Sequence, residues 1–476
     1  MNNKTRALVQ NIICTGAFLS NLSAGMFNIA LMDIAQDFGV PIVLAQWVVT
    51  VYLLVISVLL PIMGRLGDLF GRRTIHNIGY FCFALGALCC AFAPSLSWLI
   101  AFRVLQGVGA SMYQATNMAL IVSVFPPEKR GKALGLISTF VAAGSMVGPS
   151  LGGVLIQWLS WRTNFWILAG ISVIAWVLAQ RYIPKDVPDA SGHIDAVGAA
   201  LFATSLTGLV MAVNLGSLWG WTSPTVLVLL LVFAGCMAGF GAWCLSSRWN
   251  AYDKSSTKRA PFIELKHFND AGMNTGILIT IVTYMAAFSS QLVLPIFLRN
   301  ELGIPPAMAG FIMMGYPLAL IVASPIFGSW SDKLGSLPLL AAGLLTMGGV
   351  LIALGFLNAS YPLFLLIVLI VLLGVSMGMV TSPNNSLVMG RAGKEHLGLI
   401  SSLLALSRNL GMMFGTAAGG ALLVGGAASG DGGTGVNGFR TVFIICLILI
   451  LFCLLALLVS VRYTKRRHHH EETVSS

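Results

Sequence analysis

Long apolar blocks separated by short polar loops dominate the chain. Each block has roughly 18 to 28 residues, the length that a helix needs to cross a hydrocarbon layer about 30 Å thick. Helices suit lipid because each one satisfies its own backbone hydrogen bonds. The pattern predicts fourteen membrane-spanning helices, at residues 11–32, 44–63, 76–94, 97–124, 134–158, 163–182, 196–217, 223–246, 272–298, 306–329, 337–357, 361–389, 397–427 and 440–461.

The composition excludes a water-soluble fold. Hydrophobic residues make up 57% of the 476 residues and charged residues 9%, whereas a soluble domain has about 25% charged residues. The net charge of +11 does not indicate nucleic acid binding, because the basic residues lie in short loops between apolar blocks. All eight cysteines lie inside apolar blocks without metal-ligand spacing, so we interpret them as packing residues and expect neither a metal nor a cofactor.

The distribution of Lys and Arg predicts the orientation of the chain in the membrane. Of 27 such residues, we place Arg162, Arg299 and Arg440 outside and Arg103 and Arg408 within spans. The others lie in alternate loops or at the termini, which the positive-inside rule assigns to the cytoplasm. The first block is too long for a cleavable signal peptide. We therefore expect a multi-pass protein of the cytoplasmic membrane with both termini in the cytoplasm.

Two internal repeats predict the fold class. Gly64, Asp68 and Gly71 recur as Gly328, Asp332 and Gly335, each 264 positions further along the chain. A second repeat relates 135–138, Gly148 and Gly152 to 398–401, Gly411 and Gly415. We predict an all-α membrane protein of two six-helix, pseudo-symmetric bundles with two inserted helices. The expected units are an N-terminal bundle at 1–185, an insertion and linker at 186–260, a C-terminal bundle at 261–462 and a cytoplasmic tail at 463–476.

Two glycine-rich motifs predict a conformational latch and a close contact between helices. A tight loop between the second and third spans combines one carboxylate with three arginines, and we interpret it as a conformational latch formed by Gly64, Asp68, Gly71, Arg72 and the repeat residue Asp332. The alternative is a plain positive-inside loop. The fifth span carries the helix-packing motif Gly144, Gly148, Pro149, Gly152 and Gly153, which allows a close helix approach with a kink at the proline.

A polar stripe along the fourth span predicts the transport site. Arg103, Gln106, Tyr113, Gln114 and Asn117 follow helical spacing and therefore share one face. A buried Arg is costly in lipid, so it should face a water-filled cavity or a partner. The alternative is an Arg that only joins helices. The predicted substrate cavity also includes Asn21, Asn28, Tyr284, Gln291, Asn384, Asn385 and Arg408.

These motifs resemble the major facilitator superfamily. The segment from Gly64 to Arg73 is similar to its loop signature, residues 103–109 to its fourth-span signature, and the stretch from Gly144 to Gly153 to the fifth-span signature of antiporters. Fourteen spans resemble the drug:proton antiporter branch. The resemblance implies alternating inward- and outward-open states, a proton moving in as substrate moves out, and a role for Arg103 in handling protons or substrate.

The acidic residues depart from that branch. Ser23 occupies the first-span position where the branch usually has Asp, and Met32 replaces a proline. We place all 16 acidic residues in loops or at span ends, and no His well inside a span. Proton antiport needs a titrating group at the site, and cationic cargo needs a buried carboxylate. A neutral or anionic cargo suits the remaining amides, hydroxyls and arginine better.

Two functional hypotheses remain at this point. The first is a multidrug-type exporter that exchanges its cargo for protons. The second is a dedicated carrier or importer of one neutral or anionic metabolite, vitamin-like or organic-acid-like, with weak or no proton coupling. An enzyme is disfavoured because no constellation of buried His, Cys and acid suggests chemistry. The expected partners are a small-molecule substrate, with protons as a candidate second one, and the lipid bilayer; we expect a monomer and no nucleic acid.

Overall fold

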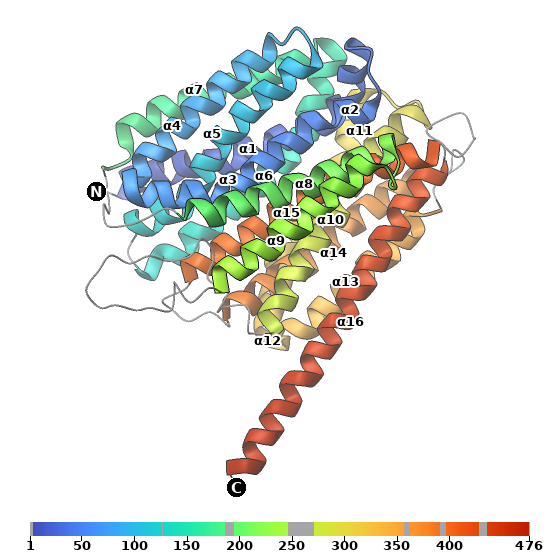
Figure 1. Ribbon diagram of the computed structural model, residues 1–476. Coiled ribbons are helices and arrows are strands. Elements are labelled where there is room, and N and C mark those ends of the chain that lie inside the picture. The colour runs from blue at the N-terminus through green and yellow to red at the C-terminus, as the bar shows by residue number, and fades with distance from the viewer. Residues whose placement is uncertain are drawn as a thin grey trace.

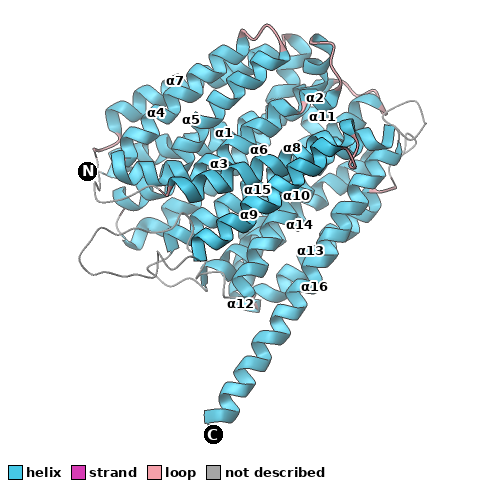
Figure 2. Ribbon diagram, viewed as in Figure 1, coloured by secondary structure: helices cyan, strands magenta, loops and turns pink. Residues whose placement is uncertain are grey.

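The computed structural model describes residues 3–125, 127–185, 195–245, 271–356, 362–390, 397–427 and 436–475. Almost all of these residues are helical, and no strand occurs among them (Figure 2). The helices of the first part are α1 (Asn3–Asp37), α2 (Ile42–Ala45), α3 (Trp47–Phe70), α4 (Arg72–Ala91), α5 (Leu96–Val124), α6 (Pro127–Trp158) and α7 (Trp161–Tyr182). Two further helices follow, α8 (Ala196–Trp219) and α9 (Pro224–Leu245). The last part holds α10 (Ala271–Asn300), α11 (Pro306–Met313), α12 (Gly315–Leu334), α13 (Ser336–Leu354), α14 (Leu363–Gly390), α15 (Leu397–Ala427) and α16 (Val436–Ser475).

Every predicted span falls on a helix or on a pair of consecutive helices. The second span is divided into α2 and α3 at Gln46, and the tenth into α11 and α12 at Met314. Both dividing residues keep right-handed helical backbone angles, so the chain barely changes direction there. Within the described residues, eleven segments are long and apolar enough to cross a membrane. Sixteen helices in the described part of the chain, of which α2 with α3 and α11 with α12 each form one span, give fourteen spans and confirm the predicted all-α membrane fold. Figure 1 shows these helices packed into one bundle.

The two repeats occupy equivalent places in the two halves. We call α1–α7 the N-terminal half and α10–α16 the C-terminal half. Gly71 precedes α4 with φ 93°, and Gly335 precedes α13 with φ 85°. Side chains with a Cβ rarely adopt positive φ, so glycine at both turns lets one helix end and the next begin at once. The loop repeat seen in the sequence is thus one tight turn used twice.

Close glycine contacts also recur between the halves. Gly107 of α5 lies against the backbone of Tyr52 in α3, and Gly374 of α14 lies against that of Tyr316 in α12. The same holds for α6, where Gly148 and Gly152 lie against α1, and for α15, where Gly411 and Gly415 lie against α10. Equivalent helices in the two halves therefore pack through equivalent glycines, as a pseudo-two-fold relationship requires.

The inserted helices lie along one side of the molecule (Figure 1). α8 packs against α9 and also against α3 of the N-terminal half and α15 of the C-terminal half. α9 exposes apolar side chains such as Val228 and Leu231. An exposed, wholly apolar helix face fits a lipid environment. The pair thus covers the side on which α3 and α15 meet.

The predicted boundaries between the domains remain predictions. The boundaries after residues 185 and 260 border segments outside the described residues. The boundary after residue 462 falls inside α16, which continues through the predicted tail to Ser475 and projects beyond the bundle in Figure 1. At 40 residues, α16 is about twice as long as a membrane crossing requires.

Candidate functional site

Arg103 of α5 lies fully buried inside the N-terminal half. Its Nε donates to the carbonyl oxygen of Val48 at 2.7 Å, and its Nη1 donates to Ser23 Oγ at 2.9 Å and to Gln106 Oε1 at 2.6 Å. No hydrogen-bond partner for Nη2 occurs among the described residues. The guanidinium is therefore held by neutral oxygens from α1, α3 and α5, with no carboxylate among these partners.

Three aromatic rings enclose the same guanidinium. Its central carbon lies 4.2 Å from the ring centroid of Tyr52, 4.8 Å from that of Phe27 and 5.9 Å from that of Phe165. Attraction between the cation and the ring faces offsets part of the cost of removing the charge from water. The sequence predicted that Arg103 faces a water-filled cavity or a partner; it is 0% exposed, and its described contacts are partners. The rings close that access in this conformation, so the assignment of Arg103 to the substrate cavity remains a prediction.

The rest of the α5 stripe bonds mainly to α1. Ser20 Oγ lies 2.8 Å from Tyr113 OH and accepts a hydrogen bond from Gln114 Nε2 at 2.9 Å. With its amide oriented to satisfy both partners, Asn117 donates to the carbonyl oxygens of Ile13 and Tyr113. The stripe therefore joins α5 to α1, and the structure brings Arg103, Gln106, Tyr113, Gln114 and Asn117 to one face as predicted from the spacing.

His76 corrects the expectation that no His lies well inside a span. It lies in the second turn of α4, is 0% exposed, and its Nδ1 is 3.0 Å from Thr116 Oγ1. Its ring packs edge-on against Tyr80, whose hydroxyl donates to the carbonyl of Ile12. The predicted third span begins at His76, but α4 begins four residues earlier, directly after Gly71. His76 therefore lies a full turn inside the helix.

The predicted residues of the C-terminal half are more dispersed. Asn384 Nδ2 of α14 donates to the carbonyl oxygen of Gly276 and to Thr280 Oγ1, both at 2.8 Å and both on α10. Asn117 and Asn384 thus play equivalent roles, because each joins its helix to the first long helix of its half. Gln291 is buried, whereas Tyr284, Asn385 and Arg408 are half-buried.

In the first span, Asn21 and Asn28 differ in their surroundings. Asn21 Nδ2 donates within α1 to the carbonyl of Ala17 at 2.8 Å. Asn28 is buried, and its Oδ1 has no hydrogen-bond partner among the described residues. A buried acceptor without a partner costs free energy, so Asn28 is the stronger candidate for an interaction with a bound molecule.

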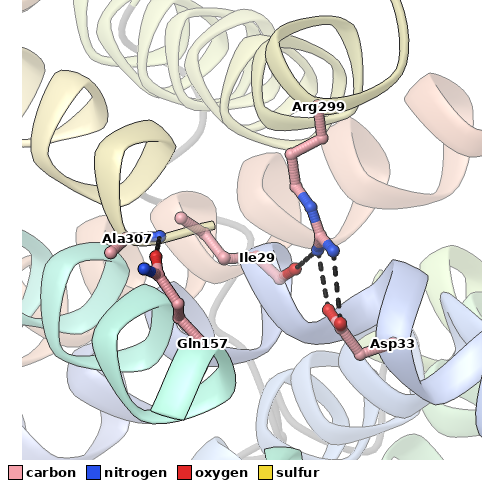
Figure 3. Close-up of polar contacts among 5 residues, drawn as sticks. All are labelled: Ile29, Asp33, Gln157, Arg299 and Ala307. Atoms are coloured by element: carbon pink, nitrogen blue, oxygen red, sulfur yellow. Dashed lines mark hydrogen bonds and ion pairs between the residues drawn. The ribbon is translucent and has the colours of Figure 1, made fainter. Parts of the chain in front are cut away.

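The halves meet through polar contacts at one end of the bundle (Figure 3). Arg299 of α10 forms an ion pair with Asp33 of α1 at 2.7 Å and also donates to the carbonyl oxygen of Ile29 at 2.9 Å. Beside it, Gln157 Oε1 of α6 accepts from the backbone N–H of Ala307 in α11 at 3.1 Å. Arg299 was expected in an outer loop, and its pairing with Asp33 was not predicted from the sequence.

Glycines of the fifth-span motif reinforce this contact. Gly153 of α6 lies against the carbonyl of Pro306, and Gly310 of α11 lies against the carbonyl of Pro149. Gly144, Gly148 and Gly152 instead face α1. The motif therefore contacts both halves, with α1 on one side and α11 on the other.

Only some residues of the predicted conformational latch are among those that the structure describes. Gly71 forms the turn described above, and Gly64 lies near Ala115 of α5. The side chains of Asp68 and Asp332 lie outside the described residues, so their pairing, including that with Arg72, stays a prediction. Among the residues that the structure describes, no group of three His, Cys, Asp or Glu side chains could hold a metal ion.

Two pseudo-symmetric helical halves with a buried polar interior define a membrane transporter. The chain belongs to the Major Facilitator Superfamily, whose sequence profile matches residues 13–252 and 276–475. It is therefore a member of a family of small-molecule transporters embedded in the membrane.

Similar proteins include carriers of different kinds. A riboflavin transporter, RibZ of Clostridioides difficile, is 34% identical over 416 residues, which cover 87% of each chain. The multidrug resistance protein Stp of Mycobacterium tuberculosis (strain H37Rv) is 29% identical over 423 residues, covering 88% of this chain and 76% of Stp. In fold, the chain is similar to the crystal structure of the POT family transporter PepTSo, with a TM-score of 0.66, 16% identity and coverage of 98% and 99%.

Proposed function

We propose that this protein carries one neutral, planar, hydrogen-bonding metabolite of the flavin class across the cytoplasmic membrane by alternating access. The observation that carries the proposal is the chemistry of the buried interior. Among the described residues, the buried polar side chains comprise Arg103, His76, amides and hydroxyls, without an Asp or Glu. The similarity to a riboflavin transporter supports the same class of cargo.

Three buried polar groups without a partner suit such a cargo. Two buried donors lack a hydrogen-bond partner among the described residues, Arg103 Nη2 and Gln106 Nε2. One buried acceptor, Asn28 Oδ1, also lacks a partner there. A flavin ring presents carbonyl acceptors and an imide N–H, so it can satisfy both kinds of group. The rings of Phe27 and Tyr52 beside the guanidinium offer stacking surfaces. We infer that these groups meet the cargo in a state in which the aromatic rings of the N-terminal half no longer cover the guanidinium.

The contacts between the halves support a state that is closed on the outer side. The ion pair between Asp33 and Arg299 and the contact between Gln157 and Ala307 join the halves at the end where few basic residues lie. The positive-inside rule makes that end external. We propose that these contacts close the outer side, and that cargo reaches the interior from outside only after they break.

Proton-coupled drug export is the second candidate function. The glycine motif of α6 resembles that of antiporters, fourteen spans resemble the drug:proton branch, and Stp is a multidrug resistance protein. This candidate predicts cargo movement driven by a proton gradient. His76 is the buried titratable imidazole that such coupling could use among the described residues.

Transport in proteoliposomes distinguishes the two candidates. Purified protein is reconstituted, and the uptake of labelled riboflavin and of a cationic dye is measured with and without an imposed pH gradient. We expect saturable riboflavin flux that competing flavins inhibit and that collapse of the gradient leaves unchanged. Dye flux that requires the gradient, without riboflavin flux, contradicts the proposal and favours drug export.

A further inference from the structure

A pocket separate from the transport site opens between the end of α3, the start of α4 and the end of α7. Its floor is a polar contact between α4 and α7. Asn77 Nδ2 donates to Gln180 Oε1 at 2.7 Å, and Arg73 Nη2 donates to the carbonyl oxygen of Gln180. These bonds hold the two helices together, so the pocket exists without a bound molecule.

Positive charge lines one side of the pocket. Arg73 and Lys185 both contribute to its wall, and no carboxylate is among its lining residues. The Arg73 guanidinium, which also donates to Gln180, stays positively charged and adds to this wall. The pocket also includes Thr74, in the first turn of α4, where the helix dipole favours an anion. A phosphate-sized anion is therefore favoured at this end.

The opposite side of the pocket is apolar and continues onto the outer surface of the bundle. Phe70 is 61% exposed and Phe81 is 46% exposed, and the ring of Phe81 packs against Trp176 with centroids 5.5 Å apart. Beside Trp176, Ile174 and Val177 on α7 are also exposed. Large exposed apolar side chains on membrane-spanning helices face lipid tails.

We propose that this pocket binds one anionic glycerophospholipid of the cytoplasmic leaflet. Its phosphate lies between Arg73 and Lys185 at the start of α4, and its acyl chains follow Phe81 and Trp176 along the groove between α4 and α7. The two-sided chemistry of the pocket matches that of one lipid molecule, whereas soluble phosphate would leave the apolar side without a ligand. Anionic lipids are enriched in the cytoplasmic leaflet. The positive-inside rule makes this end of the bundle cytoplasmic.

Native mass spectrometry of the full-length protein tests the proposal. The purified protein is titrated with phosphatidylglycerol, phosphatidylcholine or glycerol phosphate, and the first binding step is compared. With two cations at the headgroup, we expect phosphatidylglycerol to bind about tenfold more tightly than phosphatidylcholine, and the preference to shrink as salt is raised. Equal binding of the two lipids by the unmodified protein overturns the proposal, as does equally tight binding of glycerol phosphate.

Two variants, each with a control, place the preference at this pocket. Thr74→Glu puts a carboxylate at the phosphate position, and in the first turn of a helix it does not oppose folding. We expect it to abolish the preference for phosphatidylglycerol, whereas Thr74→Gln retains it. The double variant Arg73→Gln, Lys185→Gln should also lose the preference, while the charge-matched control Arg181→Gln, Lys333→Gln keeps it.

If Thr74→Glu still prefers phosphatidylglycerol, the lipid binds at another surface and the proposed lipid site is wrong. If the Arg73 variant does not fold because its bond to Gln180 is lost, the comparison of Thr74→Glu with Thr74→Gln decides alone. Riboflavin flux is not part of either readout, so the lipid proposal and the transport proposal fail independently.

Discussion

Arg299 reaches from α10 to both carboxylate oxygens of Asp33 on α1, at 2.7 and 3.2 Å, and so joins residues of the two halves that lie 266 positions apart (Figure 3). Their side chains are only 13% and 24% exposed. Partial burial reduces screening by water and makes this pair stronger than an exposed one.

Breaking this pair should open the outer side. In Asp33→Asn we expect the outward-open state to become about tenfold more populated, which corresponds to about 1.4 kcal/mol. Labelling of Asn28→Cys by an impermeant maleimide, in a background without the native cysteines, measures that population. The exchange Asp33→Arg, Arg299→Asp should restore the original labelling rate.

The chain offers a matched control in a second ion pair. Arg162 and Asp37 are 2.6 Å apart at the same end, but both belong to the N-terminal half. Asp37→Asn should therefore leave the labelling rate unchanged. An equal increase in both variants would show that charge at this surface, rather than closure between halves, governs access.

Arg103 should not tolerate replacement by Lys. Lys keeps the charge but lacks the planar fork that bonds Val48, Ser23 and Gln106 together. We expect Arg103→Lys to lower substrate flux by at least about tenfold, because losing even one charged hydrogen bond costs about 1.5 to 3 kcal/mol. Arg162→Lys, at a partly exposed arginine, is the control. Unchanged flux in Arg103→Lys would refute a role that depends on the guanidinium.

Glycine at position 148 should be required for packing. A Cβ there would lie 3.0 Å from Gly25 Cα and from the carbonyl oxygen of Leu22. We expect Gly148→Ala to lower the free energy of unfolding by about 1 to 3 kcal/mol. Gly170→Ala on α7 meets nothing within 4 Å and should raise stability by up to about 1 kcal/mol. Thermal unfolding in detergent measures both, and equal effects would contradict the close contact.

The amide of Asn384 should be needed as a donor. Asn384→Asp would place a carboxylate oxygen against the carbonyl of Gly276, where Nδ2 now donates. We expect Asp to destabilise the protein more than Ala, which removes a bond worth about 0.6 kcal/mol in a membrane protein. The same thermal measurement compares the two variants. Greater stability of the Asp variant would show that the amide is not a required donor.

The sequence predicted the spans well because the bilayer fixes their length and polarity. It could not predict the breaks at Gln46 and Met314, since both residues keep helical backbone angles within one apolar block. Gly71 was recognised as a turn residue, but the start of α4 directly after it was missed, and with it the burial of His76.

The site was less predictable because its contacts join side chains from several helices. Helical spacing identified the polar face that carries Arg103 and Gln106. It could not show that Phe27, Tyr52 and Phe165, from three other helices, would cover the guanidinium. The pairing of Asp33 with Arg299 likewise requires the halves to be closed at that end, and neither residue lies in a repeated motif.

The inserted pair has a mechanical consequence. Since α8 touches both α3 and α15, any rocking of the halves must slide α3 or α15 along the surface of α8. Apolar contact surfaces on α8 would let that movement proceed while keeping lipid out of the junction between α3 and α15. Transporters built from twelve helices alone would have to seal the same seam with the moving halves themselves.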